Sequence, residues 1–339
     1  MKYGDDITSE ARKVNPVAQS TADSPLSPEN ASSPLRTFFQ VRFKKMRPNL
    51  SLYLLILFPL SYFLIFCYWP MYGVQIAFKD FYAIKGITGS PWAGFKHFET
   101  FFHSIFFDRV VWNTVKISFY SILFGFPAPI LLALLMNELK SRFFRKVVQN
   151  ISYAPYFISQ VVMVGILLVF LSPTNGLINK IVEFLGGNPI AFMMEPGWFQ
   201  SIFVSSGIWQ GTGWGTVIYM AVLAGVDHQQ IEAAILDGAN KWQRIWHISL
   251  PCIMPTAVIL LILSSGSIMN VGFEKVFLMQ NSSNMEASDV IATYVYRKGL
   301  LNIEYSFATA VGLFNSVINF VILVVVNAFA RRAGSTSLW

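Results

Sequence analysis

The chain has 339 residues, of which 54% are hydrophobic and only 13% are charged. Soluble proteins carry about a quarter charged residues, so this composition excludes an ordinary soluble domain and indicates an integral membrane protein. The net charge of +7 fits basic residues beside anionic lipid headgroups, and we expect no nucleic-acid partner. The two cysteines, Cys67 and Cys252, lie far apart in the sequence and predict neither a disulfide framework nor a zinc site.

Residues 1–49 are predicted to form a cytoplasmic tail. Its first 33 residues mix Ser, Pro, Asn and Asp without apolar periodicity, which is typical of a disordered segment. Residues 35–49 alternate phenylalanines with basic residues. This basic juxtamembrane segment fits either an interfacial helix or the flank of a first span. The apolar stretch that follows is too long for a cleavable signal peptide, so we expect it to be retained as a span.

Six windows without Asp, Glu, Lys or Arg are each long enough for the roughly 20 residues that cross a bilayer. They place spans at 50–71, 115–136, 149–171, 202–225, 253–272 and 307–329. The predicted fold is therefore an all-α integral membrane protein with six transmembrane helices. Its transmembrane domain covers residues 50–330, and residues 331–339 form a short C-terminal tail.

The distribution of basic residues predicts the orientation of these spans. The side that carries both termini holds 16 Lys and Arg residues, and the other side holds 8. Cytoplasmic loops of membrane proteins carry the excess of Lys and Arg. We therefore expect a multi-pass protein with both termini in the cytoplasm.

Several predicted spans contain residues that bend helices or let them approach closely. Among these residues, Pro127 and Pro129 lie in the second predicted span, Pro155 in the third and Pro255 in the fifth. In the fourth span, Gly207, Gly211 and Gly215 form two consecutive small-x-x-x-small steps, which allow close helix packing. The alternative is that this glycine-rich span lines a solute path whose wall must move. Outside the spans, residues 176–187 predict a small amphipathic helix bounded by glycines.

Residues 227–251 form a polar helix–turn–helix between the fourth and fifth predicted spans. Asp227 with Gln230, and Asn240 with Gln243, have the spacing of capping boxes that begin helices. Both predicted helices are amphipathic, because their apolar residues recur at helical spacing. A polar element in this place predicts a partner at the cytoplasmic membrane surface.

Gly238 and Pro251 predict where these two helices end. Glycine permits the left-handed conformation that closes a helix, so Gly238 is expected to separate the two. Pro251 is expected to end the second helix before the next span begins.

The chain lacks the motifs of an enzyme. Its four histidines show no metal-ligand spacing, and no G-x-x-x-x-G-K-[ST] phosphate loop is present. We therefore expect no catalytic residue, no metal and no cofactor in this chain, so that another chain must supply energy for any pumping. Charged residues inside the spans are scarce, which argues against a carrier driven by protons or sodium.

The predicted loop at residues 227–251 resembles the cytoplasmic loop of permease subunits of ATP-binding-cassette (ABC) importers. That loop reads Glu-Ala-Ala, three residues, Gly, nine residues, Ile-x-Leu-Pro. The matching residues here are Glu232, Ala233, Ala234, Gly238, Ile248, Leu250 and Pro251. The resemblance implies that the first helix is a coupling helix, which docks on a cytoplasmic ATPase subunit through Glu232 and Asp237.

A second resemblance narrows the family. Residues 68–81 and 86–102 are similar to type I carbohydrate importers of the oligosaccharide and polysaccharide-uptake branch, and to alginate-oligosaccharide importer permeases in particular. This implies a bacterial inner-membrane complex of two permease subunits, commonly different, with two ATPases that bind ATP and Mg. A separate extracytoplasmic solute-binding protein delivers the cargo in this family. The long N-terminal tail departs from the family pattern.

Aromatic and polar residues in or beside the later spans are candidates for lining a sugar path. They are Trp209, Trp214, Tyr219, Asn270, Phe273, Glu274 and Asn315. The alternative for such aromatic residues is an anchoring belt at the membrane interface. Three alternatives for the whole protein stay open: an ABC permease for another solute class, a self-contained channel or secondary carrier, and a membrane scaffold without a path.

Overall fold

The computed structural model describes residues 50–332, and every regular element in this range is a helix. The β structure in this range consists of one isolated antiparallel bridge between Lys79 and Trp92. The predicted all-α fold is therefore confirmed for this part of the chain. The predictions for residues 1–49 and for residues 333–339 lie outside the described residues.

The chain divides into two compact units, the first ending at Trp69 and the second beginning at Pro70. The described part of the first unit consists of α2 (Leu50–Tyr62) and the π-helical segment η2 (Phe63–Tyr68). The 3-10 helix η3 (Trp69–Phe78) follows at the boundary. All other elements belong to the second unit.

Four helical stretches are long and apolar enough to cross a membrane: Ser51–Phe78, Phe107–Asn137, Lys241–Ser265 and Tyr305–Arg332. They overlap the first, second, fifth and sixth predicted spans, and the last of them is α17. The second consists of α5 (Phe107–Gly125) and α6 (Pro127–Asn137). Residues 50–332 therefore contain four helices that are long and apolar enough to span, where the sequence predicts six spans.

The third predicted span is broken in the structure. It is divided into α7 (Arg142–Tyr153), the 3-10 turn η4 (Ala154–Phe157) and α8 (Gln160–Phe170), and the two arms are bent by 101°. Pro155 lies in the turn and has no backbone N–H to donate to the preceding helix. The hydroxyl of Ser159 then caps α8 by accepting from the N–H of Val162. If the bent pair is one span, the number of spans rises to five.

The fourth predicted span corresponds to α10 (Pro196–Leu223), a helix of 28 residues. At 1.5 Å per residue it is about 42 Å long, which exceeds the thickness of the hydrocarbon core. Its many Gly, Ser, Thr, Gln and Trp residues make it too polar to count among the apolar helices. Hydroxyl groups within it are satisfied locally, because Ser206 donates to the carbonyl of Ile202 and Thr216 to that of Gly213.

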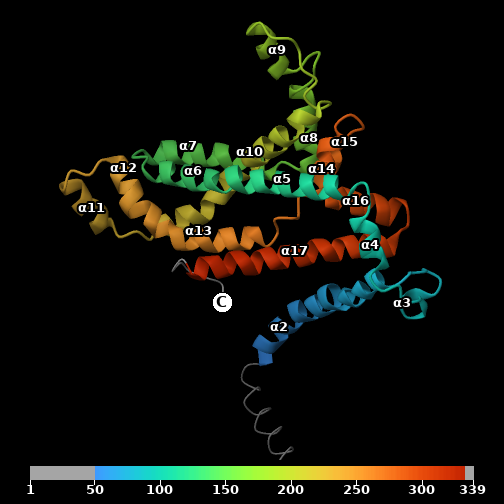
Figure 1. Ribbon diagram of the computed structural model, residues 1–339. Coiled ribbons are helices and arrows are strands. Elements are labelled where there is room, and N and C mark those ends of the chain that lie inside the picture. The colour runs from blue at the N-terminus through green and yellow to red at the C-terminus, as the bar shows by residue number, and fades with distance from the viewer. Residues whose placement is uncertain (1–49, 333–339) are drawn as a thin grey trace, which may run out of the picture. The chain divides into compact units, whose positions relative to one another are not determined.

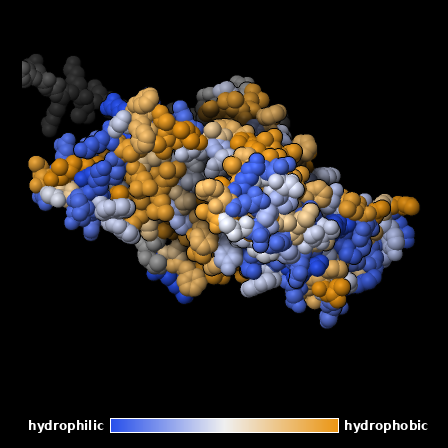
Figure 2. Space-filling model, turned by 90° about the horizontal axis from the view of Figure 1, so that it is seen from above, coloured by the Kyte–Doolittle hydropathy of each residue, from blue (hydrophilic) through white to orange (hydrophobic). Residues whose placement is uncertain are grey.

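α10 is the central packing element of the second unit and lies along α5 and α6 (Figure 1). One hydrophobic cluster joins α6, α10 and α13 (Leu250–Ser265) through Leu134, Tyr219 and Ile253. Many other apolar side chains remain exposed, and Figure 2 shows hydrophobic residues covering broad areas of one face. Such a surface suits contact with lipid or with partner subunits.

The glycines of α10 differ in what surrounds them. A Cβ at Gly213 would overlap the backbone carbonyl of Ser152, and one at Gly215 would lie 2.8 Å from Cγ of Pro129. A Cβ at Gly211 would meet nothing within 4 Å. Close helix approach therefore depends on Gly213 and Gly215, while Gly211 serves no close approach within the described chain.

Short helices occupy the loops predicted to lie outside the cytoplasm. They are α3 (Gly86–Gly89), α4 (Lys96–Phe102), α9 (Leu177–Phe184), α14 (Phe273–Met279), α15 (Met285–Ser288), α16 (Ile291–Tyr296) and the π turn η6 (Arg297–Leu301). The predicted amphipathic helix at 176–187 is confirmed as α9.

Ion pairs hold these loops to one another. The buried carboxylate of Asp289 accepts from Arg297 at 2.7 Å and from Arg109 at 3.4 Å, which joins the start of α5 to the α16 region. Nearer the first span, the ammonium group of Lys96 lies 3.0 Å from Asp80 and holds the pKa of that carboxyl below its usual value. These loops are therefore cross-linked by charge as well as by apolar packing.

Candidate functional site

The loop between α10 and α13 begins with α11 (His228–Leu236), at one end of the second unit (Figure 1). The carboxylate of Asp227 caps this helix by accepting from the N–H of Gln229 at 2.9 Å. No side-chain hydrogen bond returns from Gln230 to Asp227 in the described chain, so the first predicted capping box is wrong in detail. The helix nevertheless starts where the sequence places it, because the Asp227 cap alone satisfies one of the free amides.

The second helix, α12 (Lys241–Arg244), begins with the predicted capping box. The side-chain oxygen of Asn240 accepts from the N–H of Gln243 at 2.9 Å. In return, the side-chain oxygen of Gln243 accepts from the N–H of Asn240 at 2.7 Å. This second box is confirmed, and it fixes the direction in which the chain leaves the turn.

The turn between the two helices depends on Gly238. Its φ of +82° lies in the left-handed region, which side chains with a Cβ rarely adopt. Its N–H donates to the carbonyl of Ile235 at 3.0 Å, and the N–H of Ala239 donates to that of Ala234 at 2.9 Å. This pair of bonds is the Schellman arrangement that closes a helix, and it confirms the predicted break.

Pro251 does not end the second helix, and that prediction is wrong. The chain stays helical from Lys241 to Ser265, passing through the π turn η5 (Ile245–Ser249). In this turn the N–H of Leu250 donates five residues back, to the carbonyl of Ile245. Pro251 follows as one of the first residues of α13, where its missing N–H is tolerated. The second helix of the loop therefore continues into the fifth predicted span as one helical stretch, which contains a single π turn.

Arg244 fastens the loop to the rest of the molecule. Its guanidinium lies 2.6 Å from a carboxylate oxygen of Glu138, the residue that follows α6, and also donates to the carbonyl of Ala239 at 3.2 Å. Both charged side chains are about 15% exposed. No local pattern in the sequence predicts this pair. The one signal for it is that Glu138 is the single carboxylate in the basic segment 137–147.

The residues predicted to contact an ATPase differ in exposure. Three of them, Ala234, Ile248 and Leu250, are half-buried against their own chain, whereas Glu232, Ala233, Asp237, Gly238 and Pro251 are exposed. The carboxylates of Glu232 and Asp237 form no ion pair or hydrogen bond with side chains in residues 50–332. The apolar side chain of Leu236 is 87% exposed beside them. This surface presents two unpaired carboxylates next to an uncovered apolar residue.

The seven candidates for a solute path fall into two groups. Asn270, Phe273 and Glu274 follow the end of α13, and Asn315 lies opposite them on α17. The side-chain amide of Asn315 donates to Asn270 at 2.9 Å. The Phe273 ring lies 5.1 Å from that of Tyr296, and Glu274 is exposed.

The second group lies on α10. The Trp214 ring stacks on Tyr156 with centroids 4.8 Å apart, and Trp209 is 51% exposed. Tyr219 is only 3% exposed and packs in the hydrophobic cluster with α6 and α13. No hydrogen bond or ring contact joins the two groups within the described chain. A role for these seven residues in a solute path stays a prediction.

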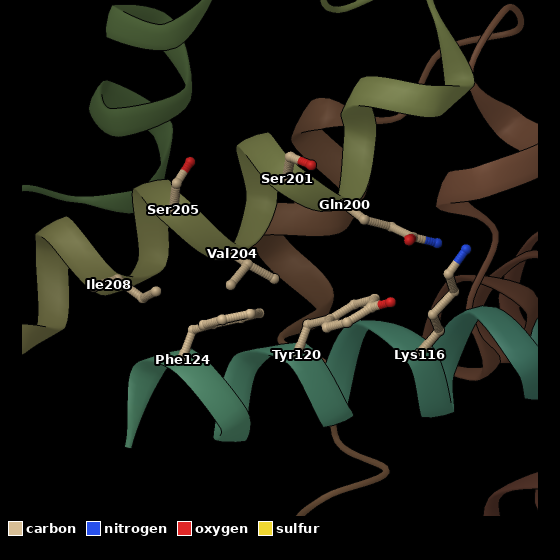
Figure 3. A pocket seen from close by; sticks show the side chains of 8 residues that line it. All are labelled: Lys116, Tyr120, Phe124, Gln200, Ser201, Val204, Ser205 and Ile208. Atoms are coloured by element: carbon tan, nitrogen blue, oxygen red, sulfur yellow. The ribbon is translucent and has the colours of Figure 1, made fainter. Parts of the chain in front are cut away.

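A cavity of about 490 Å³ lies between α5 and α10 (Figure 3). Its apolar part is lined by Phe124, Val204 and Ile208. Its polar part has the ammonium group of Lys116 and the amide of Gln200, whose ends point toward one another. No pattern in the sequence predicts this cavity, because Lys116 and Gln200 are brought together only by helix packing. Rings, an amide and an ammonium group are groups that bind sugars bearing carboxylates.

The comparisons with known proteins agree on one family. The model of the family described as "Binding-protein-dependent transport system inner membrane component" matches residues 125–335. Protein LplB of Bacillus subtilis is 44% identical over 288 residues, covering 85% of this chain and 91% of that protein. The polygalacturonan/rhamnogalacturonan transport system permease protein YteP of the same organism is 40% identical, covering 85% of this chain and 90% of that protein.

A solved structure is similar over nearly the same range. It is the crystal structure of a bacterial alginate ABC transporter in complex with an alginate pentasaccharide-bound periplasmic protein. One of its chains matches with a TM-score of 0.80 and 41% sequence identity. The match covers 87% of this chain and 99% of that chain.

Proposed function

Because this chain belongs to the family of binding-protein-dependent transport system inner membrane components, we propose that it is the permease subunit of an ATP-driven importer of oligosaccharides. Members of this family are membrane components of ABC transporters and are not themselves ATPases. The observation that carries the proposal is the loop of α11 and α12. Glu232 lies on α11 and Asp237 directly follows it, the start and end of α11 are fixed by Asp227 and Gly238, and the neighbouring α12 is attached to Glu138 through Arg244.

The coupling role follows from the chemistry of this surface. An exposed carboxylate without a partner can form a charge-assisted pair with an arginine of an ATPase subunit. Leu236 would be covered at the same time, which adds apolar burial to the contact. Since α12 continues into α13 without a break, movement of α11 is transmitted to the membrane segment. ATP-driven closure of the partners would thereby shift the permease between two arrangements.

The assembly proposed here has further parts. This chain would pair with a second permease, commonly a different chain. Two cytoplasmic ATPases would bind ATP and Mg, and an extracytoplasmic solute-binding protein would deliver the cargo. We place the chain in the bacterial inner membrane with six spans and both termini in the cytoplasm. The fourth span would be α10, whose locally satisfied hydroxyl groups reduce the cost of placing it in lipid.

The proposed cargo is an oligosaccharide rich in uronic acids, such as an alginate fragment. Two of the similar proteins have names that refer to acidic glycans, the polygalacturonan/rhamnogalacturonan permease and the alginate transporter. The cavity between α5 and α10 supports this choice, because Lys116 offers a cation beside the Tyr120 ring. A permease for another solute class is the alternative.

The proposal is tested with the complete importer reconstituted in proteoliposomes, by measuring ATP hydrolysis and uptake of labelled alginate oligosaccharide together. Glu232→Lys should abolish most uptake while ATP hydrolysis continues, because charge reversal opposes docking. Glu99→Lys is the matched control, since Glu99 is an exposed carboxylate of α4 on the opposite predicted side. Unchanged coupled uptake in Glu232→Lys would contradict the coupling role. Uptake by the purified chain alone would instead support a secondary carrier.

A further inference from the structure

A second cavity, of about 810 Å³, lies beside the loop formed by α11 and α12 (residues 227–251), which we call the coupling loop. It is bounded by the turn from α6 to α7, by the end of α10, and by α11 and α12. Six cationic side chains from these elements line it: Lys140, Arg142, Arg145, Lys146, Lys241 and Arg244. Glu138 is the single carboxylate in its lining. The cavity is therefore strongly positive.

The positive charge is not neutralised within the described chain. Glu138 is already paired with Arg244 at 2.6 Å, and the other five cations form no ion pair in residues 50–332. The Nε–H groups of Arg145 and Arg244 are buried and have no hydrogen-bond partner among the described residues. A buried donor without an acceptor is unfavourable, so these two groups favour binding of a hydrogen-bond acceptor, and the surrounding cations favour one that is anionic.

The position of the cavity points to the membrane surface as the source of that acceptor. The apolar helix that includes α6 ends at Asn137, and the cationic lining begins three residues later at Lys140. On the other face of α7, the apolar side chains of Phe143, Phe144 and Ile151 are 78%, 52% and 69% exposed. A helix end with one cationic face and one apolar face suits the region where lipid headgroups meet acyl chains.

We propose that this cavity binds the headgroup of an anionic phospholipid. Basic pockets at the cytoplasmic ends of membrane helices attract anionic lipids, and each juxtamembrane cation adds to that attraction. The lipid phosphate would accept from Arg142 and Lys146 on α7 and from Lys241 on α12. The headgroup would thus join the coupling loop to the end of the second span, a consequence that rests on the proposed function.

Native mass spectrometry of the full chain released from nanodiscs tests the binding directly. The nanodiscs contain phosphatidylcholine with increasing amounts of phosphatidylglycerol, and bound phosphatidylglycerol is counted. The double variant Arg142→Gln, Lys146→Gln should bind it about thirtyfold more weakly, which corresponds to about 1 kcal/mol for each cation. The matched control is Arg331→Gln, Arg332→Gln, which removes two exposed cations at the end of α17 outside the cavity. It should keep the affinity of the unaltered chain.

Three results would overturn the proposal. The first is equal binding of phosphatidylglycerol and phosphatidylcholine by the unaltered chain. The second is displacement of the lipid by millimolar glycerol phosphate, which would show a site for a soluble anion. The third is unchanged lipid affinity in the double variant with loss of the ATPase subunits from the purified importer, which would make the cavity an ATPase docking surface.

Further measurements distinguish loss of lipid binding from misfolding of the variant and from failure of the proposed import function. Circular dichroism and gel filtration check the fold of the double variant. If it does not fold, Lys241→Gln takes its place and should weaken binding about fivefold, since it removes one cation. Lipid binding is measured without transport, so it can succeed even if the proposed import function is wrong, and fail even if that function is right.

Discussion

At the scale of single residues, the pair of Arg244 and Glu138 fastens the loop of α11 and α12 to the end of α6. The two residues are 106 positions apart and meet with both side chains about 15% exposed. A partly buried charge that loses its partner is left both desolvated and unpaired. Removing one member should therefore be worse than removing both.

The first prediction concerns this pair. Arg244→Met should lower the free energy of unfolding by about 2 kcal/mol, because it leaves the Glu138 carboxylate unpaired. The double variant Arg244→Met, Glu138→Gln should recover about 1 kcal/mol of that loss. Thermal unfolding in detergent checks the stability. Hydrogen exchange should show faster exchange of the amides in α11 for Arg244→Met.

The double-mutant cycle provides its own control. Additive effects of Arg244→Met and Glu138→Gln would mean that the two side chains do not interact in solution. The bond from Arg244 to the carbonyl of Ala239 would then be what holds the loop.

At the scale of elements, the glycines of α10 affect both its hydropathy and its packing. Its glycines lower its hydropathy, and two of them allow neighbouring backbone and proline atoms to come close. Gly213 meets the carbonyl of Ser152 just before the bend between α7 and α8, so this helix fixes the place of the bent pair. Gly211, two residues earlier, has free space around it.

The second prediction uses this difference. Gly213→Ala should destabilise the protein by about 1–3 kcal/mol and lower its unfolding temperature by several degrees, because the new methyl group collides with backbone. Gly211→Ala is the matched control on the same helix. It should be neutral or stabilise by up to about 1 kcal/mol, since alanine favours the helix.

Thermal unfolding of both variants in the same detergent makes the comparison. Equal effects of the two substitutions would mean that α10 does not contact Ser152 as closely in the membrane.

At the scale of the whole molecule, the number of spans depends on two elements. The arms α7 and α8 are bent by 101°, and α10 is long but polar. If both regions cross the bilayer, there are six spans and the termini lie on the same side. If α10 does not cross, the segment after α8 and the coupling loop lie on the same side.

The third prediction follows from the six-span arrangement. In a chain whose two cysteines are replaced, Thr174→Cys and Ser283→Cys should react with an impermeant thiol reagent added outside intact cells. Lys140→Cys and Asp237→Cys should react only after the membrane is opened. All four positions are exposed or half-buried in the structure.

The pair of Thr174 and Asp237 tests α10 alone, because this helix lies between them. Labelling of both from the same side would contradict a spanning α10 and remove the fourth span.

Local chemistry explains which features could be predicted. The Asp227 and Asn240 caps, the Gly238 break and the amphipathic helix α9 each depend on residues within a few positions of one another. The Pro251 prediction was wrong because a π turn precedes the proline and lets the helix continue, while Ile245 and Ile253 on either side of it pack in the cluster with α6 and α10. Sequence rules for helix ends do not include such packing.

The sequence by itself determined that this is an all-helical membrane protein with a polar helical loop between two apolar segments, because hydropathy and capping are local and additive along the chain. Only the tertiary structure decided the rest. It brought Arg244 to Glu138, placed Lys116 beside Gln200, bent α7 against α8, and gathered six cations around one cavity. These contacts join segments far apart in sequence, and their geometry depends on how the helices pack, which no local pattern of residues specifies.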